Sequence, residues 1–156
     1  MDIDIRRATP ADLPGVAASS AALFAEDGAT RDPLRNADWP RDNGQAWVDE
    51  LFAAPDALVL AAASHDGTVV GHLIGHFAAA SAMFTAPRTE LVSMRVVPEY
   101  RGQNIGGRLV EEFFAWSRER GAARFHVSAY AANESAIRFY RRHGFAPLSI
   151  QLAAGA

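Results

Sequence analysis

The 156-residue sequence contains no cysteine and no lysine. The absence of cysteine excludes a disulfide framework, a thiolate metal site and a cysteine nucleophile. No apolar run is long enough to cross a bilayer, and the N-terminal residues lack the pattern of a signal peptide, so we expect a cytoplasmic protein with no membrane partner. The formal net charge of −3 argues against a nucleic-acid partner. No group of side chains has the spacing of metal ligands, so we expect no metal.

The charges that are present are unevenly distributed. Between residues 26 and 56 eight acidic residues accompany three arginines, whereas arginines outnumber acids between residues 95 and 142. A basic half suits a phosphate-rich cofactor, and an acidic half suits a cationic acceptor. A solvated acidic helix surface explains the acidic half equally well.

Hydrophobic periodicity and turn residues predict one mixed α/β domain over residues 1–156. Asp66 and Gly67 predict a β-hairpin, whereas helices between the later strands predict parallel pairing. The element order is β-α-α-β-β-β-α-β-α-β, with helices on both faces of the sheet. We expect strands at 3–8, 57–64, 69–80, 89–97, 123–130 and 145–152, and helices at 10–26, at 42–54 (capped by Asp42 or Asn43), at 105–120 and at 133–143.

The most informative segment joins a predicted strand to a predicted helix. Residues 96–109 read V-x-P-x-x-R-G-x-x-I-G-x-x-L. A glycine-containing loop that opens a helix presents unpaired N–H groups, and the helix dipole adds partial positive charge, so this segment predicts a phosphate site. Gly102 and Gly107 have the spacing of a P-loop, but Arg108 and Leu109 stand where that motif requires Lys and Ser or Thr. The dinucleotide fingerprint G-x-G-x-x-G is also absent.

This segment resembles the acyl-CoA-binding motif of the GNAT superfamily of N-acetyltransferases. Downstream, residues 133–145 read N-x-x-A-x-x-F-Y-x-x-x-G-F, which is similar to a characteristic helix of that family. One departure is Asn104, which replaces the first glycine of the usual R-x-x-G-x-G/A pattern. Asn tolerates positive φ better than other non-glycine residues, so we expect the turn of the loop to form.

The resemblance implies that acetyl-CoA is the co-substrate and that loop amides hold its diphosphate. It also implies that pantetheine lies between two diverging strands like an added strand, and that a backbone amide near Met94 or Arg95 stabilises the thioester oxyanion. The cofactor-binding residues implied in this way are Met94, Val96, Val97, Arg101, Gly102, Gln103, Asn104, Ile105, Gly106, Gly107, Asn133 and Tyr140.

Acetyl transfer to an amine needs a base for the ammonium proton and an acid for the leaving thiolate. An alkyl ammonium with a pKa near ~10.4 is deprotonated in about one molecule in a thousand at neutral pH. Glu90 matches a carboxylate position of the family and is the candidate base. His72 and His76, which alternate on one strand face, are rival bases, and His126 is a weaker candidate. Tyr140 matches the family tyrosine that reaches the CoA sulfur and is the candidate acid.

We therefore expect an N-acetyltransferase that acts on a small or polycationic primary amine by direct attack in a ternary complex, because no residue stands out as an acyl-carrying nucleophile. Acetylation of a peptide N-terminus or a protein lysine is an alternative. A non-catalytic CoA-binding regulatory domain and a nucleotide-binding protein are alternatives of other classes. Because the sequence ends soon after Phe145, we expect the family's final hairpin to be shortened to one strand, with a homodimer partner covering the exposed edge.

Overall fold

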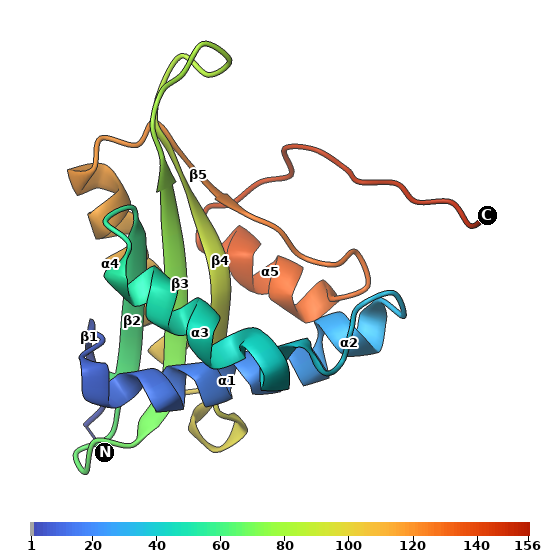
Figure 1. The fold of residues 1–156 in the computed structure, drawn as a ribbon. Helices are drawn as coiled ribbons and strands as arrows, with labels where there is room; N and C mark the ends of the chain where they lie inside the picture. Colours follow the sequence, from blue (N-terminus) through green and yellow to red (C-terminus); the bar gives the residue numbers. More distant parts are fainter. Residues whose placement is uncertain (1) are drawn as a thin grey trace.

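The computed structural model describes residues 2–156, which form one mixed sheet in the order β1-β2-β3-β4-β5 (Figure 1). The first four strands pair antiparallel with their neighbours, and β5 pairs parallel with β4, so the predicted mixed sheet is confirmed. The strands are β1 (Asp4–Arg7), β2 (Ala57–Ala63), β3 (Val69–Ala78), β4 (Arg88–Val96) and β5 (Arg124–Val127).

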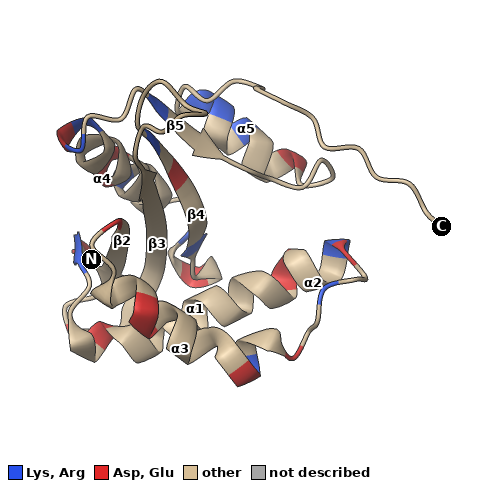
Figure 2. Cartoon of the chain, turned by 45° about the horizontal axis from the view of Figure 1, so that its top comes forward, with Lys and Arg blue, Asp and Glu red and all other residues tan. Residues whose placement is uncertain are grey.

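Helices cover both faces of the sheet, as predicted (Figure 2). One face of the sheet carries α1 (Leu13–Glu26) and α3 (Trp39–Ala53) and is called the front face. The opposite, back face carries α4 (Ile105–Glu119) and α5 (Glu134–Arg142). The short helix α2 (Gly28–Arg31) follows α1, and 3-10 turns at Pro10–Asp12 and Pro98–Tyr100 precede α1 and α4. Within residues 2–156 no helix combines the length and the apolar character needed to cross a membrane.

Strand β2 separates two cores, because its side chains alternate between the faces. Leu58 and Leu60 pack on the back face, and Val59 and Ala61 pack on the front face. The back core is the larger and is filled by one stripe of α4. The stripe predicted from helical periodicity is buried as expected and comprises Ile105, Leu109, Phe113 and Trp116.

The structure differs from the sequence prediction in four places, the first being that the strand expected at 123–130 ends at Val127. Residues 145–152 form no strand, because beyond Phe145 their backbone groups pair with nothing else in residues 2–156, and a strand needs a partner. Helix α3 begins at Trp39 rather than after a cap at Asp42 or Asn43, because Pro40 fits the first helical turn. The predicted loop that follows α1 contains the short helix α2.

Candidate active site

Strands β4 and β5 run side by side at one end only. Their register joins Arg88–Leu91 to Arg124–Val127, and beyond Leu91 the two strands diverge (Figure 1). A cavity of about 680 Å³ lies at the open end, bounded by β4, the end of α1, the loop before α4 and α5. Its volume is in the range of small-molecule sites. The diverging strands predicted from the family resemblance are therefore present.

Strand β4 carries a bulge next to this cavity. Ile74 pairs with Ser93 but Gly75 pairs with Leu91, so Val92 has no partner on β3. A bulge re-aims the backbone groups beside it and is common next to active sites. The sequence did not predict this irregularity, because the apolar run of β4 contains no turn residue that would mark it.

The loop before α4 forms one wall of the cavity. Gly102 has φ 81° and Asn104 has φ 61°, so both adopt the left-handed conformation, and the expected tolerance of Asn104 is confirmed. Within the described residues, the N–H groups of residues 102–107 meet no backbone acceptor. These donors, together with the positive end of the α4 dipole, make the loop suited to an anion such as a diphosphate.

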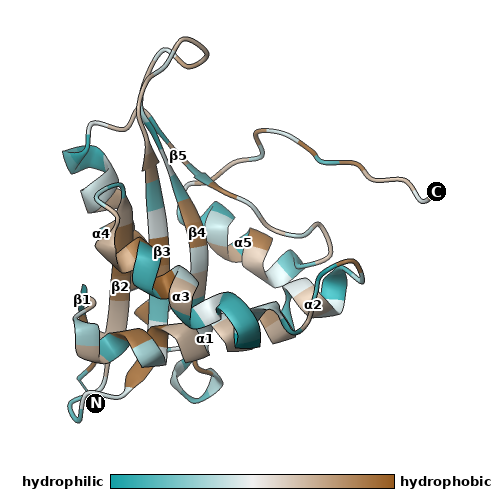
Figure 3. Ribbon diagram, viewed as in Figure 1, coloured by the Kyte–Doolittle hydropathy of each residue, from teal (hydrophilic) through white to brown (hydrophobic). Residues whose placement is uncertain are grey.

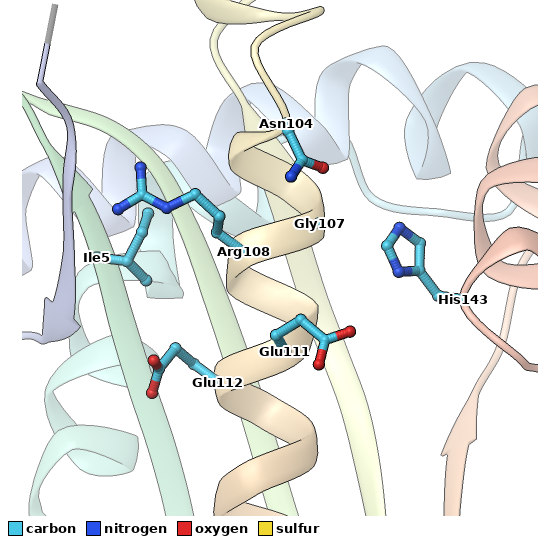
Figure 4. A pocket seen from close by; sticks show the side chains of 7 residues that line it. All are labelled: Ile5, Asn104, Gly107, Arg108, Glu111, Glu112 and His143. Carbon is cyan, nitrogen blue, oxygen red and sulfur yellow. The ribbon is translucent and has the colours of Figure 1, made fainter.

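Glycines allow two close approaches at the start of α4. A Cβ atom on Gly107 would lie 2.2 Å from Oδ1 of Asn104, so any side chain at this position requires the Asn104 amide to move. A Cβ atom on Gly106 would lie 3.3 Å from the ring of Phe139 on α5. Figure 4 shows Asn104 and Gly107 at the rim of a second cavity, of about 310 Å³, on the back face. The first turn of α4 therefore separates two hollows.

Most of the residues implied as cofactor contacts line the 680 Å³ cavity, and only Val97 and Gln103 do not. Val97 packs against the back core, and its N–H donates to the carbonyl of Val70 at 2.9 Å. Gln103 is exposed at the tip of the loop. The remaining contacts come from β4, the loop and α5, which the fold brings together around one space.

Tyr140 lines the cavity and packs edge-on against Phe139 and Phe145. Burial raises the pKa of the Tyr140 hydroxyl to about 12, and the charge of Asp27 contributes to the same shift. The hydroxyl therefore stays protonated at neutral pH, as a proton donor must.

Asn133 connects α5 to the front layer. Its Oδ1 accepts the N–H of Ala136 at 3.2 Å, which caps α5, and its Nδ2 donates to Oδ1 of Asp27 at 3.2 Å. The same Asp27 oxygen accepts Nε of Arg31 at 2.6 Å. This side-chain bridge joins the end of α1 to the start of α5.

Glu26 is a cavity residue that sequence reasoning missed. Its carboxylate accepts Nη2 of Arg95 at 2.6 Å and Nη2 of Arg101 at 3.5 Å, and the Arg95 hydrogen bond lowers the pKa of Glu26. Arg101 also donates Nε to the carbonyl of Val96 at 2.9 Å. Arg101, one of the implied cofactor contacts, is thus held beside the cavity by two acceptors. No local signal could reveal Glu26, because 69 residues separate it from Arg95.

His72 is fully buried beneath α1 and does not reach the cavity. Its Nδ1 lies 2.6 Å from Oγ of Ser19, and its Nε2 lies 2.8 Å from Oγ of Ser93. Burial, with a smaller contribution from the charge of Arg95, lowers the pKa of His72 to about 3. With both ring nitrogens bonded inside the core, His72 has no access to a substrate proton.

Glu90, His76 and His126 are register neighbours on the front face, where the sheet extends beyond α1 and α3. None of the three lines the cavity. Nε2 of His126 accepts Nε of Arg124 at 2.8 Å, and burial lowers the pKa of His126. Glu90 and Met94 are four positions apart on the strand, about 13 Å at ~3.3 Å per residue. A base at Glu90 must therefore act along the front of β4 or through water.

Comparisons with known proteins agree with this geometry. A sequence model of the Acetyltransferase (GNAT) family matches residues 29–145. The streptothricin acetyltransferase of Streptomyces lavendulae is 34% identical over 109 residues, which are 69% of this chain and 55% of that protein. The chain spans about half the length of the curated relatives that it matches.

Solved structures show the same fold. A tetramutant of the BH1408 protein of Bacillus halodurans matches with a TM-score of 0.87 and 18% identity, covering 98% of this chain and 99% of that one. The aminoglycoside N-acetyltransferase AAC(6')-Iy in complex with CoA matches with a TM-score of 0.74 and 16% identity, covering 99% of this chain and 95% of that one.

Proposed function

Because the chain belongs to the Acetyltransferase (GNAT) family, we propose that it transfers an acetyl group from acetyl-CoA to a small primary amine that carries further positive charge. One observation carries the proposal: the unpaired amides of the loop and the protonated Tyr140 hydroxyl share a cavity at the gap between β4 and β5. An anion-binding wall suits the CoA diphosphate, and a proton donor suits the departing thiolate.

The cavity fits acetyl-CoA in both shape and chemistry. The N–H groups of residues 102–107 and the guanidinium of Arg101 suit the diphosphate. Within residues 2–156, no strand pairs with the cavity side of β4 between Met94 and Val96, and this edge suits the amides of pantetheine. Arg142, at the C-terminal end of α5, also lines the cavity and suits a further phosphate.

The proposed reaction is a direct attack. The neutral amine adds to the thioester carbonyl, a backbone N–H of β4 near Met94 stabilises the oxyanion, and the carbon–sulfur bond then breaks. Tyr140 donates its proton to the departing sulfur, and Glu90, directly or through water, accepts the proton lost by the amine. The products are an amide and CoA thiol. Glu90 then releases its proton to solvent and Tyr140 takes one from solvent, which returns both groups to their starting states.

The acceptor is proposed to be cationic. Glu26 and Asp27 place two carboxylates on the cavity lining, where they pair with Arg95, Arg101 and Arg31, so a cationic acceptor would compete with these arginines for them. The names of the relatives point the same way, since one acetylates streptothricin and the CoA-bound one acetylates aminoglycosides. The cytoplasmic location stays a prediction.

An acetyl-CoA thiol-release screen against diamines, polyamines, aminoglycosides and peptides tests the proposal. Because the chain has no cysteine, a thiol reagent reports only released CoA. We expect turnover with polycationic small amines and little with peptides. Preferred turnover of peptides would show that the acceptor is a peptide or protein amine rather than a small amine. Tight binding of acetyl-CoA without turnover on any amine would indicate a regulatory domain.

Glu90→Gln tests the base. We expect the rise of kcat/KM with pH to move to higher pH, because a larger fraction of the amine must then be neutral before it binds. The matched control is Glu99→Gln, an exposed acid in the turn before the loop. An unchanged pH profile of kcat/KM would show that Glu90 is not the base and would leave His76 or solvent as the proton acceptor.

A further inference from the structure

The bulged part of β4 is tied to α1 by a buried polar network. Oγ of Ser93, the residue after the bulge, lies 2.8 Å from Nε2 of His72 on β3. Nδ1 of the same imidazole lies 2.6 Å from Oγ of Ser19 on α1. All three side chains are buried, and the proposed reaction uses none of them. The network joins α1, β3 and β4 at the point where β4 departs from regular pairing.

A second contact joins the same helix to the same part of β4. Oε1 of Glu26 on α1 accepts Nη2 of Arg95 at 2.6 Å. Ser19 and Glu26 are seven positions apart, about two turns at ~3.6 residues per turn, so they lie on one face of α1. Ser93 and Arg95 are two positions apart on the front face of β4. Helix α1 therefore holds β4 at two successive front-face positions, one on each side of Met94.

The surroundings of His72 are otherwise apolar. Strand β2, which pairs with β3 there, is hydrophobic along its length (Figure 3), and Ala61 and Ile74 beside His72 belong to the front core. Burial of an imidazole in such a place costs free energy unless both nitrogens are hydrogen-bonded, as they are here. Hydrogen bonds, unlike apolar contacts, are directional, so the network fixes the position of Ser93 along β4.

We infer that His72 is a positioning residue, which holds the bulged part of β4 through Ser93 and so places the backbone N–H of Met94 for the thioester oxyanion. The carbonyl of Ser93 and the N–H of Met94 belong to one planar peptide unit, so a contact that fixes Ser93 also restricts this N–H. Met94 lines the 680 Å³ cavity, whereas Ser93 and His72 do not. The inference rests on the proposed function, in which an N–H near Met94 stabilises the oxyanion.

Methionine labelling reports on the Met94 N–H without any acceptor amine. Of the three methionines, Met1 is N-terminal, so nitrogen-15 methionine gives amide signals from Met83 and Met94. We expect acetyl-CoA to move the Met94 proton signal downfield in the wild type and to move it less in His72→Phe and in Ser19→Ala. The signal of Met83, which is 84% exposed in the loop between β3 and β4, should stay in place.

The matched control for both variants is Ser117→Ala. Oγ of Ser117 lies 2.7 Å from Oγ of Thr89, so this variant also removes a buried hydrogen bond of β4, but at the end away from the bulge. The Met94 signal of Ser117→Ala should respond to acetyl-CoA as in the wild type. A Met94 signal that ignores bound acetyl-CoA in the wild type, or that responds equally in all variants, would overturn the inference. Ser19→Ala decides the question if His72→Phe does not fold.

Kinetics with an amine selected by the thiol-release screen give a second readout. We expect kcat to fall about tenfold in His72→Phe, because a displaced oxyanion donor stabilises the transition state less, while the Kd of CoA changes little. Ser117→Ala should keep the wild-type kcat. A fall of kcat of equal size in His72→Phe and Ser117→Ala would show a merely structural role and would contradict the inference. Failure of every amine to react would count against the proposed function, whereas the methionine signals would still test the positioning of Met94.

Discussion

The two sides of the cavity present different chemical groups: backbone amides on one side and charged side chains on the other. On the side of the proposed CoA diphosphate, the available groups are backbone amides of the loop and the first turn of α4, positioned by local conformation at Gly102 and Asn104. On the side of the proposed acceptor, the available groups are side chains of α1, held by ion pairs with β4 and by hydrogen bonds with α5. Binding of CoA on the first side should therefore be sensitive to changes in backbone conformation. Binding of the acceptor on the second side should be sensitive to changes in side-chain charge.

The largest expected effect lies where the two sides meet, at Tyr140. Tyr140→Phe should lower kcat by about 100-fold or more while the Kd of CoA stays nearly constant, because the hydroxyl acts on the departing sulfur. Steady-state kinetics and calorimetric CoA binding measure the two quantities. Since the pKa of Tyr140 is raised to about 12, its ionisation should add no alkaline limb to the pH profile of kcat between pH 7 and 10.

Tyr130→Phe serves as the control for this prediction, because the Tyr130 hydroxyl accepts Nε of Arg35 at 3.2 Å and does not line the cavity. An unchanged single-turnover rate in Tyr140→Phe would exclude Tyr140 as the acid. No catalytic group would then be assigned where the CoA side and the acceptor side of the cavity meet.

Acid should weaken the packing of α1 on the sheet through His72, whose Nδ1 lies 2.6 Å from Oγ of Ser19 on α1. The folded pKa of about 3 lies below the ordinary 6.5, so the unfolded chain binds more protons between these values. This contribution to stability is complete above pH 6.5 and is lost as pH falls towards 3, with a slope approaching about 1.4 kcal/mol per pH unit. Urea unfolding at several pH values measures the slope.

His72→Gln should flatten this pH dependence, whatever its effect on stability at neutral pH. His65→Gln, in the exposed turn between β2 and β3, should retain the wild-type slope. Equal slopes in all three proteins would show that the Ser19–His72–Ser93 network does not control the attachment of α1.

On the backbone-built side of the cavity, one added methyl group should weaken the binding of CoA. Gly107→Ala places a Cβ atom against Oδ1 of Asn104 and forces the Asn104 side chain to move at the wall of the cavity, so we expect the Kd of CoA to rise by about tenfold, or ~1.4 kcal/mol. In Gly44→Ala, on α3, the new methyl meets only Cβ of Pro40 at 3.8 Å. Calorimetry should show wild-type CoA affinity for Gly44→Ala, and equal affinities in both variants would contradict the proposed role of the loop.

The smallest effect, and the one with opposite signs on the two sides, is expected for Glu26→Gln. Removing this charge frees Arg95 and Arg101, so CoA should bind up to about threefold tighter while the KM of a cationic acceptor rises by a similar factor. Asp38→Asn is the control, because its 3.6 Å ion pair with Arg41 is exposed and lies outside the cavity. Changes of the same sign in both constants would contradict the division into two sides.

The sequence predicted the backbone-built side because its determinants are local. The strand, the turn and the helix of residues 96–109 are specified by neighbours in the chain. The positive φ of Asn104 is predictable because asparagine adopts this conformation more readily than other non-glycine residues. The hairpin at Gly67 and the cap at Asn133 were predictable for the same reason.

The side-chain-built side could not be predicted in this way. The contacts Glu26–Arg95 and Asp27–Asn133 join residues 69 and 106 positions apart, and no periodicity encodes such pairs. His72 was correctly placed on a strand face, but only packing under α1 shows that the face is sealed there. The missing strand at 145–152 has the right pattern and lacks only a non-local partner.

The divergence of β4 and β5 has a further consequence for local unfolding. Four register pairs and the aromatic contacts among Phe113, Phe114, Phe125 and Phe145 attach β5 and α5 to the rest of the sheet. Such a unit is expected to open as a whole at a lower free energy than the longer β2–β3 ladder. A molecule of acetyl-CoA that spans the gap would tie the two parts together, and amide hydrogen exchange in α5 would slow in proportion to its occupancy.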